Sequence, residues 1–263
     1  MRSGSARITI CMANRKPRLA IVDWGIGGVS IYNLVKSRLG NIPVIYFSDT
    51  GVTPYGRMSR RELIARLNVV IAYLRLKGAT HLALGCNAAS TVLPFLDVRG
   101  MKAAGVIDGA VRLTARKRPA KLALLGGSRT VRSGVYRRAL AAQGIAVTQR
   151  IAQPLSALIE SGDVSSPALR AQCRRILARV KDYSHVLFAC THYPAITAVL
   201  GDYVSKETVF IDPAGELVSS IKRWQLPAGG TDRFLTSGDP EQMKLSALRA
   251  FGTRIRSARK VAL

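Results

Sequence analysis

The sequence predicts an α/β protein made of two related α/β domains, with parallel-rich sheets that face each other across a central cleft. Apolar runs typical of buried strands alternate with helical patterns along the chain. A glycine turn follows a strand twice, and the motif order of the first half recurs in the second. From Leu19 to Cys86 is 67 positions, and from Leu122 to Cys190 is 68, which favours a repeated unit over a chance resemblance.

The first half begins with a buried strand that ends in the carboxylate of Asp23. A glycine-rich turn and a helix follow it. After the second strand we expect a long helix, because apolar residues recur at spacings of three and four. The elements predicted for this half are strands at 18–23, 44–49, 81–85 and 104–108, the turn 24–28, and helices at 29–39, 59–77 and 109–116.

The second half opens like the first, with a buried strand and a glycine turn over 121–128. Amphipathic patterns then predict helices, and a second apolar run ends directly before Cys190. Further elements predicted here are helices at 131–143, 154–161, 167–181, 214–224 and 240–251, a helix that ends near 200, and strands at 147–151, 185–189, 209–213 and 234–238.

The composition is strongly basic, with 40 Lys and Arg residues against 15 Asp and Glu, and a formal net charge of +25. Such a charge attracts nucleic acid and anionic membranes non-specifically, and it also draws in a small anionic substrate. The basic residues are spread along the chain, which favours a solvated basic surface. A nucleic-acid partner stays open as the alternative.

No apolar run approaches the roughly 18 residues that cross a bilayer, and no apolar signal-peptide core of about 7–15 residues follows the basic start. We therefore expect a cytoplasmic protein without membrane insertion. Residues 1–16 are polar and basic, and we expect them to form a flexible tail. The four cysteines do not suggest a disulfide framework or a metal site, although Cys86 and Cys190 could form a redox pair.

The turn from Trp24 to Gly28 has the arrangement that cradles a phosphate or carboxylate, because glycines let backbone N–H groups approach an anion. The turn lacks the third glycine of the dinucleotide fingerprint, so a nucleotide cofactor is disfavoured. A tight turn without a ligand is the other alternative.

Cys86 and Cys190 each follow a buried strand and precede a helical pattern. Ligands bind at the carboxyl ends of strands in open α/β sheets, so we expect the two thiols to face one pocket. A thiol, with an ordinary pKa of about 8.5, transfers protons near neutral pH. If one thiolate removes a proton from a carbon and a thiol on the opposite face returns one, the centre inverts without a cofactor. Asp23 and His192 are natural assistants, and two buried structural cysteines are the alternative.

Six stretches of the chain form a recognisable set: Asp23 to Gly28, Ser48 to Thr50 with Pro54-Tyr55-Gly56, Cys86-Asn87-Ala88-Ala89-Ser90, Thr130 to Tyr136, Cys190-Thr191-His192-Tyr193-Pro194 and Gly238-Asp239-Pro240. Together they resemble the motifs of the glutamate racemase branch of the aspartate/glutamate racemase superfamily. The resemblance covers nearly all of the chain from Arg18. The paired cysteine motifs are specific, whereas any single motif would not be.

The resemblance implies a cofactor-independent racemase that interconverts L- and D-glutamate for peptidoglycan synthesis. Cys86 and Cys190 would be the two bases, on opposite faces of the amino-acid substrate. Asp23 would assist Cys86, and His192 would assist Cys190 together with Glu160. The residues expected to hold the carboxylates and the amine are Pro54, Tyr55, Gly56, Asn87 and Thr191.

The resemblance also implies where the chain passes between domains. It would cross to the second domain near residue 98 and return near residue 212. The first domain would then comprise 17–98 and 212–263, and the second 99–211. Family members often form homodimers of varying arrangement, so a homodimer is an expectation with no arrangement favoured.

Two substrate-site positions depart from the family pattern, with Trp24 in place of serine and Ala88 in place of threonine. A lost polar contact to a bound ion costs about 1.5–3 kcal/mol, enough to weaken glutamate binding or change the amino acid accepted. One alternative is that Trp24 turns outward and a water replaces the hydroxyl missing at Ala88. Two others are a racemase of another amino acid such as aspartate, and a basic nucleic-acid-associated protein on a racemase fold.

Overall fold

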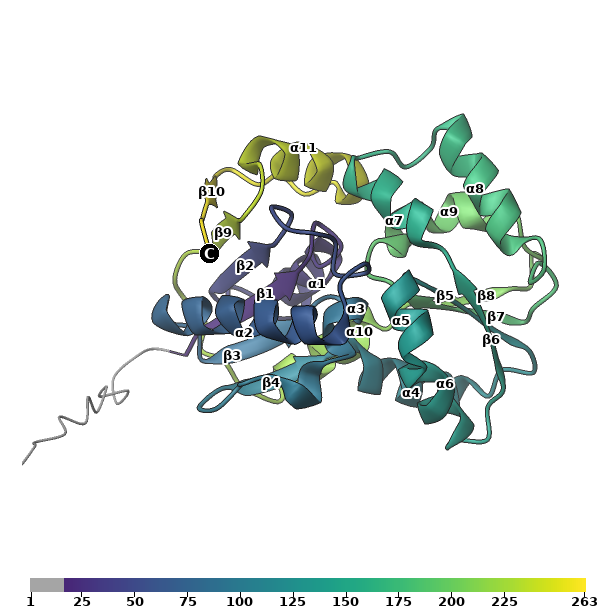
Figure 1. Cartoon of the computed structure of the whole chain (residues 1–263), viewed down its shortest axis with the longest axis horizontal. Helices are drawn as coiled ribbons and strands as arrows, with labels where there is room; N and C mark the ends of the chain where they lie inside the picture. Colours follow the sequence, from purple (N-terminus) through teal and green to yellow (C-terminus); the bar gives the residue numbers. More distant parts are fainter. Residues whose placement is uncertain (1–16) are drawn as a thin grey trace, which may run out of the picture.

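The structure, a computed structural model, describes residues 17–263, so the predicted tail 1–16 lies outside the described residues. Two sheets lie side by side, each built from parallel strands and flanked by helices (Figure 1). This confirms the predicted α/β class with parallel-rich sheets. Within residues 17–263 no helix combines the length and the apolar composition that crossing a bilayer requires.

The first sheet has the strand order β10-β9-β2-β1-β3-β4. Its strands are β1 (Leu19–Asp23), β2 (Val44–Ser48), β3 (His81–Leu84), β4 (Lys102–Gly105), β9 (Arg233–Thr236) and β10 (Ala258–Lys260). The helices associated with it are α1 (Val29–Leu39), α2 (Arg60–Leu76), the short α3 (Asn87–Ser90), the 3-10 turn η1 (Leu93–Phe95), α10 (Ala214–Lys222) and α11 (Pro240–Phe251).

The second sheet has the order β6-β5-β7-β8. Its strands are β5 (Leu122–Gly126), β6 (Val147–Ile151), β7 (His185–Ala189) and β8 (Val209–Ile211). The accompanying helices are α4 (Val106–Lys117), α5 (Ser128–Ser133), α6 (Val135–Ala141), α7 (Gln153–Glu160), α8 (Pro167–Leu177), η2 (Tyr193–Ile196) and α9 (Thr197–Gly201).

The two halves repeat one topology. The order β2-β1-β3-β4 in the first sheet corresponds to β6-β5-β7-β8 in the second. The registers also correspond, since Leu19 pairs with His81 across β1 and β3, and Leu122 pairs with His185 across β5 and β7. The near-equal motif spacing in the sequence therefore reflects two related α/β units.

The core is continuous between the halves. Alternate residues of a strand face opposite sides of its sheet. Leu19 and Ile21 of β1 belong to the same buried cluster as Leu122 and Leu124 of β5, whereas the other faces of the two sheets pack against separate clusters. One apolar layer thus packs between the two sheets and fixes their relative orientation, so that the carboxyl ends of their strands face each other.

Three local predictions differ from the structure. The strand predicted at 104–108 ends at Gly105, and Val106 begins α4, whose buried residues recur at helical spacing. The helix predicted at 131–143 is split into α5 and α6 by Gly134, which has a φ of +66°. The strand β4 lies beyond the crossover predicted near residue 98, yet it pairs with β3 in the first sheet.

Candidate active site

A cavity of about 330 Å³ lies between the carboxyl ends of the two sheets, with residues of both halves in its wall. Its volume is near the lower end of the range for ligand pockets, roughly 300–1,000 Å³. Of the residues predicted to form the site, only Glu160 lies outside the wall. Those in the wall are Asp23, Trp24, Pro54, Tyr55, Gly56, Cys86, Asn87, Ala88, Cys190, Thr191 and His192.

The strand topology explains why these residues meet. Asp23 is the last residue of β1, and Cys86 follows the neighbouring strand β3. Cys190 directly follows β7, which occupies the equivalent position in the second sheet. Parallel strands place their carboxyl ends on one edge of a sheet. Both thiols therefore line one cavity, as the sequence predicted.

Cys86 lies in an environment that favours the neutral thiol. Its side chain is 9% exposed and sits where the helical turn α3 begins. Burial raises the pKa of the thiol well above its ordinary value, and the charge of the nearby Asp23 carboxylate raises it further. A backbone hydrogen bond from Ala89 acts in the opposite direction without outweighing them. Cys86 is thus held in the form that donates a proton.

The glycine turn binds carboxylates of the protein itself. Asp23 is fully buried, and its two oxygens accept hydrogen bonds from the N–H groups of Trp24 and Gly28, each at 2.8 Å. The N–H of Ile26 donates to Oε2 of Glu160 at 2.9 Å. The turn does cradle anions, as predicted, but these three N–H groups serve side chains of the chain rather than a ligand.

Close packing requires glycine at two positions of this turn. A Cβ on Gly25 would collide with the carboxylate of Glu160. A Cβ on Gly27 would lie 2.5 Å from Nδ1 of His192 and 2.8 Å from Oδ2 of Asp23. The turn of the first half therefore sits directly on the polar groups that serve both thiols.

Cys190 is partly exposed and has a cationic partner. Its Sγ lies 3.6 Å from Nδ1 of His192, and Nε2 of His192 lies 2.8 Å from Oε2 of Glu160. Burial by itself lowers the pKa of His192. The charge of Cys190 and the hydrogen bonds with Cys190 and Glu160 outweigh it and raise that pKa well above its ordinary value. The raised pKa favours the imidazolium form of His192, and a positive charge beside a sulfur stabilises negative charge on it.

Trp24 and Ala88 both belong to the cavity wall. The indole Nε1–H of Trp24 donates to the carbonyl of Val52 at 3.2 Å, so the side chain covers the loop after β2. The outward orientation considered from the sequence is not observed. The wall therefore presents an indole and a methyl group where the family pattern has two hydroxyls.

Tyr55 is fixed in the wall by a buried ion pair. Its hydroxyl donates to Oδ2 of Asp49 at 2.7 Å. Arg66 donates to both oxygens of that carboxylate, at 2.8 and 2.6 Å, and Ser237 donates to Oδ1 at 2.7 Å. Charge-assisted, two-pronged contacts of this kind are strong and directional. They hold the loop 54–56 against the first sheet.

Asn87 belongs to the cavity wall and, within the described part of the chain, has a side-chain donor without a partner. Its Oδ1 accepts a hydrogen bond of 2.6 Å from Tyr136 of the second half. Its Nδ2 is buried and has no hydrogen-bond partner among residues 17–263. An unpaired buried donor costs about 1–3 kcal/mol. Nδ2 is therefore well suited to donate to a bound carboxylate.

Part of the wall was not predicted. These residues follow β2, β5 or β6, or end β7, and the internal repeat is the signal that would have found most of them. The turn after β5 is equivalent to the glycine turn after β1, and the start of α7 is equivalent to the loop after β2. The residues concerned are Arg57, Gly127, Thr130, Gln153, Pro154, Ser156, Ala157 and Ala189.

The cavity brings together two thiols with opposite surroundings. Cys86 and Cys190 are both free, so they do not form the disulfide of a redox pair. Cys86 lies beside Asp23 with its pKa raised, and Cys190 lies beside His192, whose pKa is raised. Such a pair can remove a proton on one side of a ligand and supply one on the other.

Comparison with known proteins extends over the same regions. A sequence model described as Asp/Glu/Hydantoin racemase matches residues 25–221. The glutamate racemase of Pseudomonas entomophila is 30% identical over 251 residues, which cover 89% of this chain and 93% of that protein. The range 25–221 includes both cysteine motifs and strands of both sheets.

Solved structures with similar folds include two glutamate racemases. One isoform from Bacillus anthracis superposes with a TM-score of 0.84 at 22% identity, over 95% of this chain and 99% of that chain. The enzyme from Thermus thermophilus, in complex with β-chloro-D-alanine, gives a TM-score of 0.82 at 26% identity, over 94% and 98% of the two chains. The overall α/β fold is common to all three.

Proposed function

Because this chain belongs to the Asp/Glu/Hydantoin racemase family, we propose that it interconverts L- and D-glutamate by proton transfer between Cys86 and Cys190. The enzyme is an amino-acid racemase, and the two-thiol reaction uses no cofactor. The observation that carries the proposal is the pairing of two sulfurs with unlike neighbours in one cavity, Cys86 beside Asp23 and Cys190 beside His192.

The reaction is balanced within the cavity. The Cys190 thiolate removes the α-proton of one enantiomer and becomes a thiol, leaving the electron pair on the α-carbon. The Cys86 thiol then gives its proton to the opposite face of that carbon and becomes a thiolate. The other enantiomer reacts by the same steps in reverse, which restores the starting forms of both sulfurs. Before a second molecule of the first enantiomer reacts, the two sulfurs regain those forms by proton exchange with water. His192 stabilises the charge at Cys190, and Asp23 acts at Cys86.

Glutamate fits the chemistry of the wall. Nδ2 of Asn87 is a buried donor that awaits an acceptor. Arg57 is the only Lys or Arg among the described residues of the wall, and it is exposed at the mouth, where a carboxylate arrives. The curated relative and the two solved structures named above are all glutamate racemases, which favours glutamate over aspartate. D-glutamate made in the cytoplasm would then supply peptidoglycan synthesis.

An amino-acid panel tests this function. Purified protein is incubated with L-glutamate, L-aspartate and other L-amino acids, and the D-isomers are separated on a chiral column. We expect D-glutamate to accumulate until the two enantiomers are equal. Formation of D-aspartate with no D-glutamate would replace the substrate and keep the reaction. No D-isomer from any of them would remove the racemase function altogether.

A nucleic-acid partner and a homodimer stay predictions. Both have direct measurements, namely retention on DNA at physiological salt and the mass of the protein in solution. Neither outcome changes the chemistry proposed for the two thiols.

A further inference from the structure

A second hollow of about 950 Å³ adjoins the reaction cavity and shares Gly56 and Arg57 with its wall. We name it the mouth groove and define it by its five arginines. Two come from the first half, in the loop after β2 and at the start of α2, and three come from α5 and α6 of the second half. They are Arg57, Arg60, Arg129, Arg132 and Arg138.

The positive charge of the mouth groove is not compensated. The only Asp or Glu among the described residues of its wall is Glu62, whose carboxylate accepts a hydrogen bond from the N–H of Ser59 at 2.7 Å and caps α2. Within residues 17–263 the five arginines form no ion pair, whereas Arg116 and Arg170 elsewhere on the surface each bind a carboxylate. Like charges gathered without counter-charge repel one another until an anion binds.

Contacts to neutral groups hold two of these arginines in place. The guanidinium of Arg60 lies 3.8 Å from the centre of the Phe95 ring. Arg129 donates to the carbonyl of Met58 across the cleft at 3.4 Å, while its Nε is buried without a hydrogen-bond partner in the described part of the chain. Burial lowers the pKa of Arg129, and the charge of Arg60 lowers it further. The guanidinium groups of Arg60 and Arg129 are therefore held in place, and Nε of Arg129 can still donate a hydrogen bond to a ligand.

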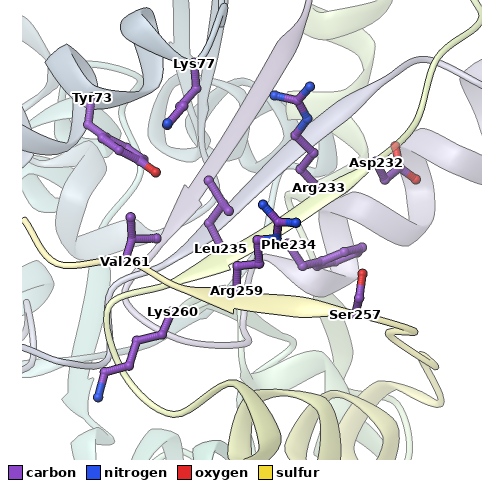
Figure 2. Close-up of a pocket in the computed structure, with 10 residues that line it drawn as sticks. All are labelled: Tyr73, Lys77, Asp232, Arg233, Phe234, Leu235, Ser257, Arg259, Lys260 and Val261. Carbon is purple, nitrogen blue, oxygen red and sulfur yellow. The ribbon is translucent and has the colours of Figure 1, made fainter.

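Another basic hollow lies at the edge of the first sheet, away from the cleft between the two halves (Figure 2). It is lined by Lys77, Arg233, Arg259 and Lys260, and its Asp232 is already bound by Lys36 at 2.7 Å. Figure 2 shows the side chains of Arg233 and Lys260 pointing in opposite directions. Its lining comes from the first half alone. It therefore serves as a control for basic charge as such.

We propose that the mouth groove binds an anion carrying several phosphate groups, which bridges the two halves and obstructs access to the reaction cavity. Arginine suits this ligand because its planar fork binds phosphate oxygens in pairs. Arginines on both sides of the cleft require several anionic groups spread along one ligand. The ligand covers Arg57, so it competes with the amino acid for access. That second effect rests on the proposed racemase function, whereas binding does not.

Binding is measured by calorimetry at about 0.15 M salt, where exposed long-range attraction is screened. The probes are inorganic tripolyphosphate and a short oligothymidylate of ten nucleotides. The test protein is the double variant R132Q/R138Q, whose side chains lie outside the wall of the reaction cavity. The control R259Q/K260Q removes the same charge from the hollow in Figure 2.

We expect tripolyphosphate to bind the unmodified protein and the control equally, and the test variant at least about tenfold more weakly, as loss of charge-assisted hydrogen bonds implies. If oligothymidylate also binds the test variant more weakly than the control, nucleic acid is identified as a source of the phosphates. If its binding does not depend on Arg132 and Arg138, the groove is assigned to small phosphate compounds. No binding of tripolyphosphate, or equal loss in test and control variants, overturns the site.

Racemase kinetics provide the second readout. Tripolyphosphate raises the KM for glutamate and leaves kcat unchanged in the unmodified protein, and it has little effect on R132Q/R138Q. Without added anion, that variant racemises glutamate as the unmodified protein does, which also shows that it folds. If tripolyphosphate binds but the KM for glutamate does not change, the proposed obstruction of the reaction cavity is wrong, while the binding site itself stands.

Discussion

The two cysteines occupy equivalent positions in two repeats of one fold, yet their surroundings are opposite. Cys86 follows β3 and is buried beside Asp23, which helps to raise the pKa of its thiol. Cys190 follows β7 and is partly exposed beside His192, whose own pKa is raised. The repeated topology supplies two matching positions on one cavity. The neighbours supplied by each half, rather than the topology, determine which sulfur is ready to take a proton and which to give one.

The largest expected effect comes from removing either sulfur. Serine keeps the size of the side chain but does not exchange protons near neutral pH, so Cys86→Ser and Cys190→Ser should each lower kcat by about 10²–10⁴-fold or more. Chiral chromatography measures the loss. Cys173→Ser, at a buried cysteine of α8 outside the cavity wall, is the matched control and should continue to racemise.

The same variants sharpen the comparison in deuterated water. With Cys86→Ser, the thiolate at Cys190 should still exchange the α-hydrogen of the single enantiomer that presents it to that side. With Cys190→Ser, exchange of the other enantiomer should be much slower, because the raised pKa of Cys86 disfavours its thiolate. Proton NMR follows the α-hydrogen. Equal exchange by both variants would show that the two sulfurs are equivalent.

Replacing Asp23 by asparagine should make Cys86 behave more like Cys190. The change removes a negative charge that helps to raise the pKa of the thiol, so that pKa should fall. A fall of one unit increases the thiolate fraction about tenfold near neutral pH. Alkylation of Cys86 by iodoacetamide should accelerate accordingly while kcat falls, with Cys86→Ser identifying the labelled site. Unchanged alkylation would contradict the role of Asp23.

Glu160→Gln should lower the activity that depends on Cys190 and His192, and the loss should be greatest at high pH. The bond to Glu160 is one of the causes that raise the pKa of His192, so that pKa should fall. The imidazolium is present below this pKa and is lost as pH rises through it. The alkaline limb of kcat should therefore move to lower pH, with about tenfold less activity above it for each unit. Glu207→Gln, at an exposed position, is the control. If the alkaline limb of kcat does not move in Glu160→Gln, Glu160 does not support the charge of His192.

The smallest effect is expected where one half supports the other. Tyr136→Phe removes the buried hydrogen bond to Asn87 and leaves an acceptor unpaired, at a cost of about 1–3 kcal/mol. The melting temperature should fall by about 2–4 °C for each kcal/mol, with kcat little changed. Tyr183→Phe, whose exposed hydroxyl contacts Thr148, should melt normally. Equal melting of the two variants would show that the contact does not join the halves.

Much of the fold was predictable because buried parallel strands are short apolar runs with clear ends. The loops after β1, β3 and β7 could be assigned to one cavity for the same reason. The strand β10 could not be predicted from the sequence, because Ala258–Lys260 has no apolar run and is defined by its pairing with β9. The orientation of Trp24 depends on a carbonyl 28 positions away, and the bond from Ile26 to Glu160 spans 134 positions. Contacts of that kind have no local signature.

The single carboxylate of Glu160 binds Ile26 of one half and His192 of the other. It thus acts as an interlock between the two halves. Any hinge movement that parts the glycine turn from α7 must break the bond to Ile26 and disturb the charge balance around His192. Cys190 would then be able to remove a proton only while the cleft is closed, and an open enzyme would bind its ligand without reacting.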